Sequence, residues 1–260
     1  MILQNKVVIV TGVGPGMGSK LAIEASRAGA EVVLVARRLE LLERLASEIG
    51  ESGGEALVEQ ADVSRPDDCK KVAKRTVERF GRIDGLVNSA YGMATMTPFE
   101  EADFDDWRRT MDVTLFGSLN MVRAVLPSMK ENGRGSIVNV GTLETRKPLL
   151  NNGAYNIPKA ALQAATRQLA AELGKYNIRV NSAVPGWMWG KPVQDYFSSN
   201  ASETGTDVDV LVAQTASQIA LGRIPPDDEC AKSVLVLLSD YCTQITGAAL
   251  DINGGHFFSL

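Results

Sequence analysis

Tyr155 and Lys159 stand four positions apart in the tract YNIPK. On a helix, side chains at this spacing lie on one face, with their Cβ atoms about 5–6 Å apart. A free phenol has a pKa near about 10, which is too high for proton transfer at neutral pH, but a nearby ammonium favours the phenolate and lowers that pKa. The pair can therefore act as a general acid/base. Such spacing is common by chance, so the interpretation depends on the elements that position it.

A glycine-rich turn, TGVGPGMG at residues 11–18, follows the first apolar run. Glycines allow a tight turn and let backbone N–H groups approach a pyrophosphate at a helix N-terminus. An ordinary strand-to-helix turn is the alternative, but a complete strand–helix–strand unit surrounds this one and favours a dinucleotide. The candidate binding residues are Gly12, Gly14, Gly16, Met17 and Gly18.

Short β-branched apolar runs alternate with amphipathic stretches along the chain. We expect strands at 6–11, 31–36, 55–60, 84–88, 135–141, 178–184 and 248–251, and helices at about 17–29, 38–52, 67–80, 101–130 and 153–176. Runs that are apolar on both faces suit parallel strands covered by helices on each side. The sequence therefore predicts an α/β protein, with residues 1–260 as one Rossmann-type domain built on a doubly wound, parallel, seven-stranded sheet.

Residues 187–225 do not fit this alternation. Their polar middle, SSNASETGTD, is typical of a mobile surface segment. Because the segment follows a late strand, we expect it to be a substrate lid at the carboxyl edge of the sheet.

Composition excludes several kinds of protein. The net charge of −4 and the lack of a basic run argue against nucleic acid as a partner. One histidine, His256, and three scattered cysteines give no metal site, and a reducing cytoplasm suits them best. The N-terminus lacks the features of a signal peptide, and no apolar run approaches the roughly 20 residues needed to span a bilayer, so no membrane is expected.

The end of the second predicted strand carries Ala36-Arg37-Arg38 and no acid. A carboxylate there would grip a ribose 2′-hydroxyl and repel a 2′-phosphate, whereas arginine can clamp the phosphate. Two solvated arginines at a helix start are the alternative. We predict that NADP(H) is preferred over NAD(H).

Two further side chains follow strands at the same edge. Asp62, after the third strand, can accept a hydrogen bond from an adenine amino group, or it can cap the next helix. Thr142, after the fifth strand, can offer its hydroxyl to a substrate oxygen.

Together these motifs resemble the short-chain dehydrogenases/reductases over essentially the whole chain. The motifs on which the resemblance depends are the turn at 11–18, ADV at 61–63, NSA at 88–90, YNIPK at 155–159 and NSAVPG at 181–186. The resemblance implies a small-molecule substrate and a homotetramer, or a homodimer. It also implies roles near the cofactor for Gly12, Gly16, Gly18, Asp62, Val63, Asn88, Ala90, Pro185 and Gly186, with Tyr155 as general acid/base and Lys159 on the ribose.

The chain departs from the family pattern at several positions. Thr142 replaces the usual catalytic serine, and Thr114 replaces the catalytic asparagine that helps hold a water linking the lysine to solvent. The contribution of that asparagine runs largely through backbone geometry, so we expect threonine to substitute for it. Gly190 replaces a threonine, and Pro158 is tolerable if it lies in the first turn of its helix. Tyr91 replaces a glycine and can narrow the cleft. The candidate pocket residues are Tyr91, Leu143, Glu144, Trp187 and Trp189, although the tryptophans can equally pack the base of the lid.

These features predict an NADP(H)-dependent oxidoreductase acting on a small to medium, apolar or cyclic secondary alcohol or ketone. A 3-oxoacyl thioester reductase is an alternative, with Arg146 and Lys147 as candidates for binding a carrier phosphate and Glu144 beside them as an objection. A non-catalytic cofactor-binding regulator is the alternative of another class.

Overall fold

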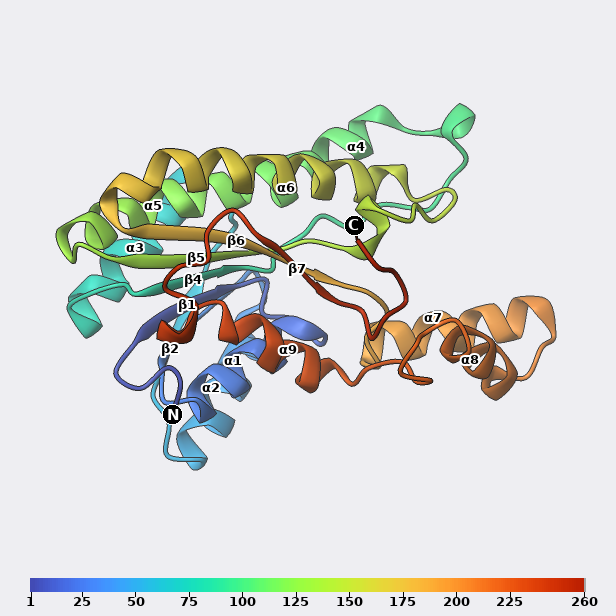
Figure 1. The fold of residues 1–260 in the computed structure, drawn as a ribbon, viewed down its shortest axis with the longest axis horizontal. Helices are drawn as coiled ribbons and strands as arrows, with labels where there is room; N and C mark the ends of the chain where they lie inside the picture. The colour runs from blue at the N-terminus through green and yellow to red at the C-terminus, as the bar shows by residue number, and fades with distance from the viewer. Residues whose placement is uncertain (260) are drawn as a thin grey trace.

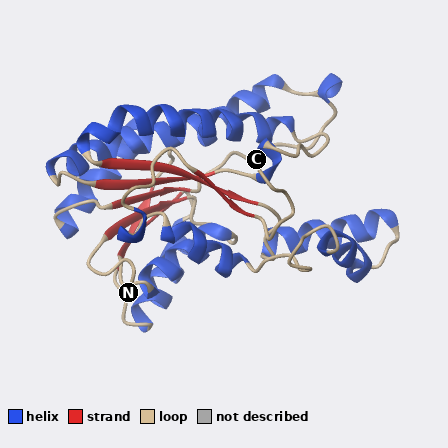
Figure 2. Cartoon of the chain, viewed as in Figure 1, coloured by secondary structure: helices blue, strands red, loops and turns tan. Residues whose placement is uncertain are grey.

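The computed structural model describes residues 1–259, and its centre is one seven-stranded parallel sheet (Figures 1 and 2). The strand order is β3-β2-β1-β4-β5-β6-β7, and every neighbouring pair is parallel. The strands are β1 Val7–Thr11, β2 Glu31–Ala36, β3 Ala56–Gln60, β4 Gly85–Asn88, β5 Gly135–Val140, β6 Ile178–Pro185 and β7 Ala249–Ile252. This sheet confirms the predicted fold, and each strand lies within two residues of its expected bounds.

Helices cover both faces of the sheet because alternate strand residues point to opposite sides. Val8 and Val10 of β1 join an apolar cluster with α1 Met17–Arg27, α2 Leu39–Glu51 and α9 Asp227–Val236. Val7 and Ile9 join a second cluster with α3 Pro66–Phe80, α5 Gly117–Glu131 and α6 Gly153–Leu173. Figure 1 shows α5 and α6 on one face and α1, α2 and α9 on the other.

The strand order reverses between β1 and β4, so helices leaving these two strands diverge to opposite faces. A crevice at such a switch point, outside the carboxyl ends of the strands, is where ligands bind in open α/β sheets. The glycine turn follows β1 and the tract containing Tyr91 follows β4, which brings both to this point. None of the helices within residues 1–259 is both long and apolar enough to cross a membrane.

The helix expected at 101–130 is divided. A short turn, η1 Phe99–Glu101, precedes α4 Phe104–Met111, which begins where the Asp103 carboxylate accepts from the N–H of Asp105 at 2.8 Å. One π-helical turn, η2 Asp112–Phe116, then joins α4 to α5. Widened turns of this kind occur frequently at functional sites, and this one contains Thr114.

The prediction that residues 187–225 are irregular is wrong, because this segment contains two helices. Residues Lys191–Thr204 form α7 and Val208–Ala216 form α8. Gly205 ends α7 at a φ of +66°, and the Asp207 side chain caps α8. The apolar side chains of both helices pack together, which overrides the weak helix propensity of the serine-rich stretch. Helix α9 was not expected at all, although four of its apolar residues are buried, Cys230, Ala231, Val234 and Leu235.

Pro158 is the sixth residue of α6, in its second turn rather than its first. Proline has no N–H, so the carbonyl of Ala154 loses the helical hydrogen bond it would receive. The hydroxyl of Thr110, on α4, lies 2.9 Å from that carbonyl and 2.8 Å from the carbonyl of Trp107. A side chain from a neighbouring helix therefore replaces the donor that the proline removes.

We predict that Thr110→Val lowers the free energy of unfolding by about 1–2 kcal/mol, because it leaves a buried carbonyl without a donor. Pro158→Ala restores an amide that can bond to Ala154, so in that background the same substitution should cost about 1 kcal/mol less. Urea unfolding of the four proteins measures this coupling. Thr76→Val, which breaks an ordinary bond to the i−4 carbonyl, serves as a control and should cost the same in both backgrounds. Equal costs of Thr110→Val in the two backgrounds would contradict the assignment.

Candidate active site

Lys159 holds its ammonium group inside the protein, at the carboxyl end of β5. Lys159 is only 2% exposed, and its Nζ donates a hydrogen bond to the carbonyl of Val140 at 2.6 Å. Nζ also lies 5.6 Å from the ring centroid of Tyr91 and 5.8 Å from that of Tyr155. Burial lowers the pKa of Lys159 to about 8. The cation is therefore partly stabilised by one carbonyl and two aromatic rings instead of by water.

Tyr155 lies in the first turn of α6, and its phenol meets the hydroxyl of Thr142. Burial raises the pKa of Tyr155, and the nearby Tyr91 and Glu144 raise it further, whereas the Thr142 hydroxyl lowers it. This differs from the expectation that Lys159 lowers the pKa of Tyr155. The main cause is the burial of the phenol itself, which disfavours the charged phenolate. The positive ring of an oxidised nicotinamide would supply charge that favours the phenolate.

Thr114 acts on this site from a distance. It is 1% exposed, its Oγ1 accepts from the N–H of Gly92 at 3.0 Å, and its carbonyl accepts from Ser118 Oγ at 2.8 Å. The bond from Gly92 joins the π-helical turn to the segment after β4, and the bond from Ser118 joins it to α5. Tyr91, next to Gly92, then packs edge-on against Tyr155, with ring centroids 5.6 Å apart and an interplanar angle of 79°. Thr114 thus holds the backbone that carries Tyr91.

The glycine turn after β1 leaves no room for a side chain at two of its positions, Gly12 and Gly18. A Cβ on Gly12, whose φ is +70°, would collide with the backbone of Ala90, and one on Gly18 would collide with the carbonyl of Gly12. Helix α1 starts at Met17 with no acidic residue in its first turn and no side-chain cap. Its first N–H groups and the open backbone around Gly14 therefore fit a pyrophosphate.

The environment of Asp62 favours the ionised form of its carboxyl group. Burial opposes ionisation, but the hydroxyl and N–H of Ser64, at 2.7 and 3.0 Å, together with the charges of Arg37 and Arg65, lower the pKa of Asp62. The alternative role as a helix cap is wrong, because α3 begins at Pro66 and Arg65 occupies its N-cap position. Arg37 and Arg38 are exposed just after β2, on the same edge.

Asn88 connects the central strands to α6. Its Nδ2 donates to Asn139 Oδ1 at 2.9 Å, and Asn139 Nδ2 donates to Thr166 Oγ1 at 2.9 Å. Asn88 and Asn139 are register partners on β4 and β5, and both are buried. The sequence analysis missed Asn139, although an asparagine inside the apolar run SIVNV was a detectable signal.

Close packing explains two glycines near the end of β6. A Cβ on Gly186 would lie 2.9 Å from Asn253 Cβ, and one on Gly190 would collide with the Asp227 carboxylate. A threonine at position 190 would meet the same carboxylate, which gives a steric reason for the departure from the family pattern. Pro185 ends β6 directly before this contact, and Val63 and Ala90 lie beside the turns after β3 and β4.

Trp187 and Trp189 pack mainly on α7. Trp187 lies 5.4 Å from Tyr196 and 5.5 Å from Phe197 between ring centroids, and Trp189 lies 6.1 Å from Phe197. Pro192, at the start of α7, would be 3.2 Å from a Cβ on Gly16. The segment 187–225 thus approaches the glycine turn at Gly16 and carries a small apolar cluster of its own.

The 3₁₀ turn η3, Leu143–Thr145, places two of the candidate pocket residues directly after Thr142. Leu143 is buried, and Glu144 is half-buried with its carboxylate bonded to Asn152. The site therefore gathers Tyr155, Lys159, Thr142, Tyr91 and Glu144 at the carboxyl ends of β4 and β5.

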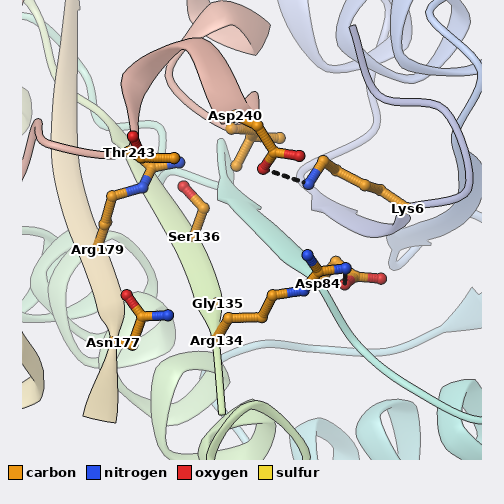
Figure 3. A pocket seen from close by; sticks show the side chains of 10 residues that line it. Lys6, Asp84, Arg134, Gly135, Ser136, Asn177, Arg179, Asp240 and Thr243 are labelled. Atoms are coloured by element: carbon orange, nitrogen blue, oxygen red, sulfur yellow. Dashed lines mark hydrogen bonds and ion pairs between the residues drawn. The ribbon is translucent and has the colours of Figure 1, made fainter. Parts of the chain in front are cut away.

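A separate cavity of about 220 Å³ lies at the amino ends of the strands, where Figure 3 shows its lining. Lys6 pairs with Asp240 at 2.8 Å, and Arg134 lies 3.8 Å from Asp84. Arg179 donates to the carbonyls of Leu237, Ser239 and Ile245. The charged groups of this cavity bind one another and the backbone, at the end of the sheet away from Tyr155.

Comparison with known proteins supports a short-chain dehydrogenase/reductase. A family model described as enoyl-(acyl carrier protein) reductase matches residues 12–256. A trans-4-hydroxycyclohexanecarboxylate dehydrogenase of Sinomonas cyclohexanicum is 35% identical over 96% of this chain and 92% of its own. A 2,5-dichloro-2,5-cyclohexadiene-1,4-diol dehydrogenase of Sphingobium indicum is 31% identical over 97% of this chain and 96% of its own.

Two solved structures are similar throughout. The L-sorbose reductase of Gluconobacter frateurii, complexed with NADPH and L-sorbose, superposes with a TM-score of 0.93 at 28% identity, covering all of both chains. An NAD⁺-bound xylitol dehydrogenase superposes with a TM-score of 0.91 at 29% identity, covering 98% of this chain and 100% of its own.

We predict that the buried ammonium destabilises the folded protein below pH 8 and that this effect fades at higher pH. Because the pKa of Lys159 is about 8 in the fold and 10.5 when free, the unfolded chain binds more protons between these values, and stability rises with pH there. Relative to Lys159→Met, the wild-type free energy of unfolding should rise by about 2 kcal/mol between roughly pH 7 and pH 9.5. Urea unfolding at several pH values measures it. Lys71→Met, at an exposed site, is the control, and a pH-independent difference for Lys159→Met would refute the prediction.

Proposed function

We propose that this chain, which belongs to the short-chain dehydrogenase/reductase family, interconverts a secondary alcohol and a ketone with NADP(H). It is an NAD(P)-dependent dehydrogenase/reductase of that family. The preference for NADP(H), the substrate class and the roles of single residues are the proposed part. The observation that carries the proposal is that Tyr155, in the first turn of α6, and Thr142, directly after β5, lie at one edge of the sheet with the buried Lys159 Nζ 5.8 Å from the Tyr155 ring centroid.

The three side chains divide the work of proton transfer. In the oxidation direction the Tyr155 phenolate takes the proton of the substrate hydroxyl, and in the reduction direction its phenol returns a proton to the carbonyl oxygen. Thr142 donates a hydrogen bond to that oxygen, and Lys159 holds the ribose and stabilises the phenolate. The nicotinamide ring accepts or supplies the hydride. The glycine turn and the first turn of α1 hold the pyrophosphate.

Arg37 and Arg38 support the choice of NADP(H). Both are exposed where β2 ends, Arg37 acts electrostatically on Asp62, and Arg38 stands at the N-cap of α2. Arginine is otherwise disfavoured at a helix N-terminus, so a 2′-phosphate gives these two charges a partner.

The substrate we propose is a small to medium alcohol or ketone. Relatives named for cyclic alcohols support a cyclic substrate, and the structures named for L-sorbose and xylitol extend the range to open-chain alcohols. The thioester reductase gains no support from the basic residues that suggested it. Arg146 is bonded to Asp251 and Ser259, and Lys147 lies 3.0 Å from His256 Nε2, so neither side chain is free for a carrier phosphate.

We further propose that residues 187–225 close over the substrate and that the protein assembles as a homotetramer, or a homodimer. Exposed aromatic side chains at Phe99, Phe104 and Phe116 on and beside α4 support an association surface. A cytoplasmic location is proposed because Cys69, Cys230 and Cys242 are free, buried thiols.

We predict that Tyr155→Phe abolishes turnover while cofactor binding is retained. Loss of the proton donor should reduce kcat by about 10²–10⁴-fold, whereas the Kd for NADPH should change less than about threefold, because the backbone turn that holds the pyrophosphate is intact. Steady-state kinetics on a ketone panel and fluorescence titration with NADPH measure the two quantities. Tyr241→Phe, on an exposed tyrosine, should behave as wild type. Full activity of Tyr155→Phe would overturn the mechanism.

We predict that the double variant Arg37→Ala/Arg38→Ala loses about 10–100-fold in kcat/KM for NADPH, as expected for lost charge-assisted bonds to a phosphate. Its kcat/KM for NADH should stay close to the wild-type value. Arg44→Ala, an exposed arginine further along α2, is the matched control. A wild-type preference for NADH over NADPH would refute the cofactor assignment.

A further inference from the structure

Glu144 presents a carboxylate that the mechanism above does not use. It is half-buried in η3, two positions after Thr142. Both of its carboxylate oxygens accept a hydrogen bond from Asn152 Nδ2, at 2.8 and 3.1 Å. Asn152 occupies the N-cap of α6, where its carbonyl accepts from the N–H of Tyr155 at 3.2 Å. The amide that orients Glu144 is therefore fixed to the same turn as the reacting phenol.

No cation neutralises this carboxylate within residues 1–259. The neighbouring Arg146 is bonded to Asp251, and Lys147 approaches His256, so the two nearest positive side chains in the sequence are engaged elsewhere. Burial raises the pKa of Glu144. A half-buried carboxylate without a positive partner is unfavourable unless other donors reach it. The single amide of Asn152 occupies only part of the acceptor capacity of the Glu144 carboxylate.

The free acceptor capacity lies beside the reacting groups. The N–H of Glu144 donates to Thr142 Oγ1 at 3.3 Å, and the negative charge of Glu144 acts on the Tyr155 phenol. A substrate whose reacting oxygen meets Tyr155 and Thr142 therefore brings its adjoining atoms close to the carboxylate. Because an ionised carboxylate only accepts hydrogen bonds, the substrate group that suits it is a donor.

We propose that Glu144, positioned by Asn152, binds a second hydroxyl group of the substrate. The preferred substrates are then neutral diols, polyols and hydroxyketones, and a substrate carboxylate near the reacting carbon is rejected. This inference rests on the proposed alcohol–ketone interconversion. It narrows the expected apolar substrate to one with a polar side, since a wholly apolar molecule would desolvate Glu144 and give it no donor.

The test compares three kinds of alcohol on one cyclohexane ring, each with NADP⁺. They are cyclohexanol, the 1,2- and 1,3-cyclohexanediols, and 2-hydroxycyclohexanecarboxylate. In the wild type, kcat/KM for the best diol should exceed that for cyclohexanol by about ten- to a hundredfold, the effect of a hydrogen bond to a charged group. The hydroxycarboxylate should be the poorest substrate, because it brings a second negative charge to Glu144.

Glu144→Gln keeps the size of the side chain and removes its charge. It should lower the diol-to-cyclohexanol ratio of kcat/KM at least tenfold and raise the hydroxycarboxylate-to-cyclohexanol ratio by a similar factor. These opposite changes separate recognition from a structural defect, which would lower all three values together. Asn152→Leu, which frees the carboxylate from its amide, should lower the diol ratio as well, and Glu43→Gln, on the exposed surface of α2, should leave both ratios unchanged.

The outcomes distinguish the two levels of the proposal. Oxidation of all three alcohols with ratios that Glu144→Gln does not change overturns the role of Glu144 and leaves the proposed function standing. The absence of turnover with every alcohol and with either cofactor overturns the proposed function, and the role of Glu144 falls with it.

Discussion

The site depends on a positive charge held inside the protein at the carboxyl end of β5. The Lys159 ammonium donates a hydrogen bond to the Val140 carbonyl and lies near the rings of Tyr91 and Tyr155. Such a group is unfavourable in the interior, and the surrounding fold must hold it there. Helix α6 is secured against the sheet by the buried Asn88–Asn139–Thr166 chain and against α4 by Thr110. Rigid support of this kind keeps a reacting group in one position.

The sheet could be predicted from the sequence because its signal is local. A run such as VVIV in β1 is apolar on both faces, and only a strand covered from both sides buries it fully. The glycine turn was equally clear, since Gly12 and Gly18 occupy positions where a side chain would collide with backbone. The helices at 191–204 and 208–216 were not foreseen, because their stability comes from packing against one another rather than from propensity.

The site was predicted as a set of residues and not as a set of contacts. Tyr155, Lys159 and Thr142 come together as the spacing indicated, but the direction of the Tyr155 pKa depends on how far each group is buried, which no spacing reveals. Thr114 was identified by position, and only the structure shows that it holds Gly92. Glu144 in η3 and Asn152 at the N-cap of α6 are eight positions apart, and neither residue type alone indicates that their side chains bond.

The small apolar cluster of α7 and α8 has a consequence for how this protein can diversify. Its members, including Phe197, Ile219 and Ile224, form a group distinct from the two clusters that sandwich the sheet. Figure 1 shows α7 and α8 side by side, away from the helices that cover the sheet. Replacements there rearrange packing within residues 187–225 and leave the cores beneath β1–β7 as they are. On the proposed role of residues 187–225 in closing over the substrate, substrate range and the stability of the cofactor-binding body can evolve as separate traits, and a designer can graft or randomise this helical pair without redesigning the sheet.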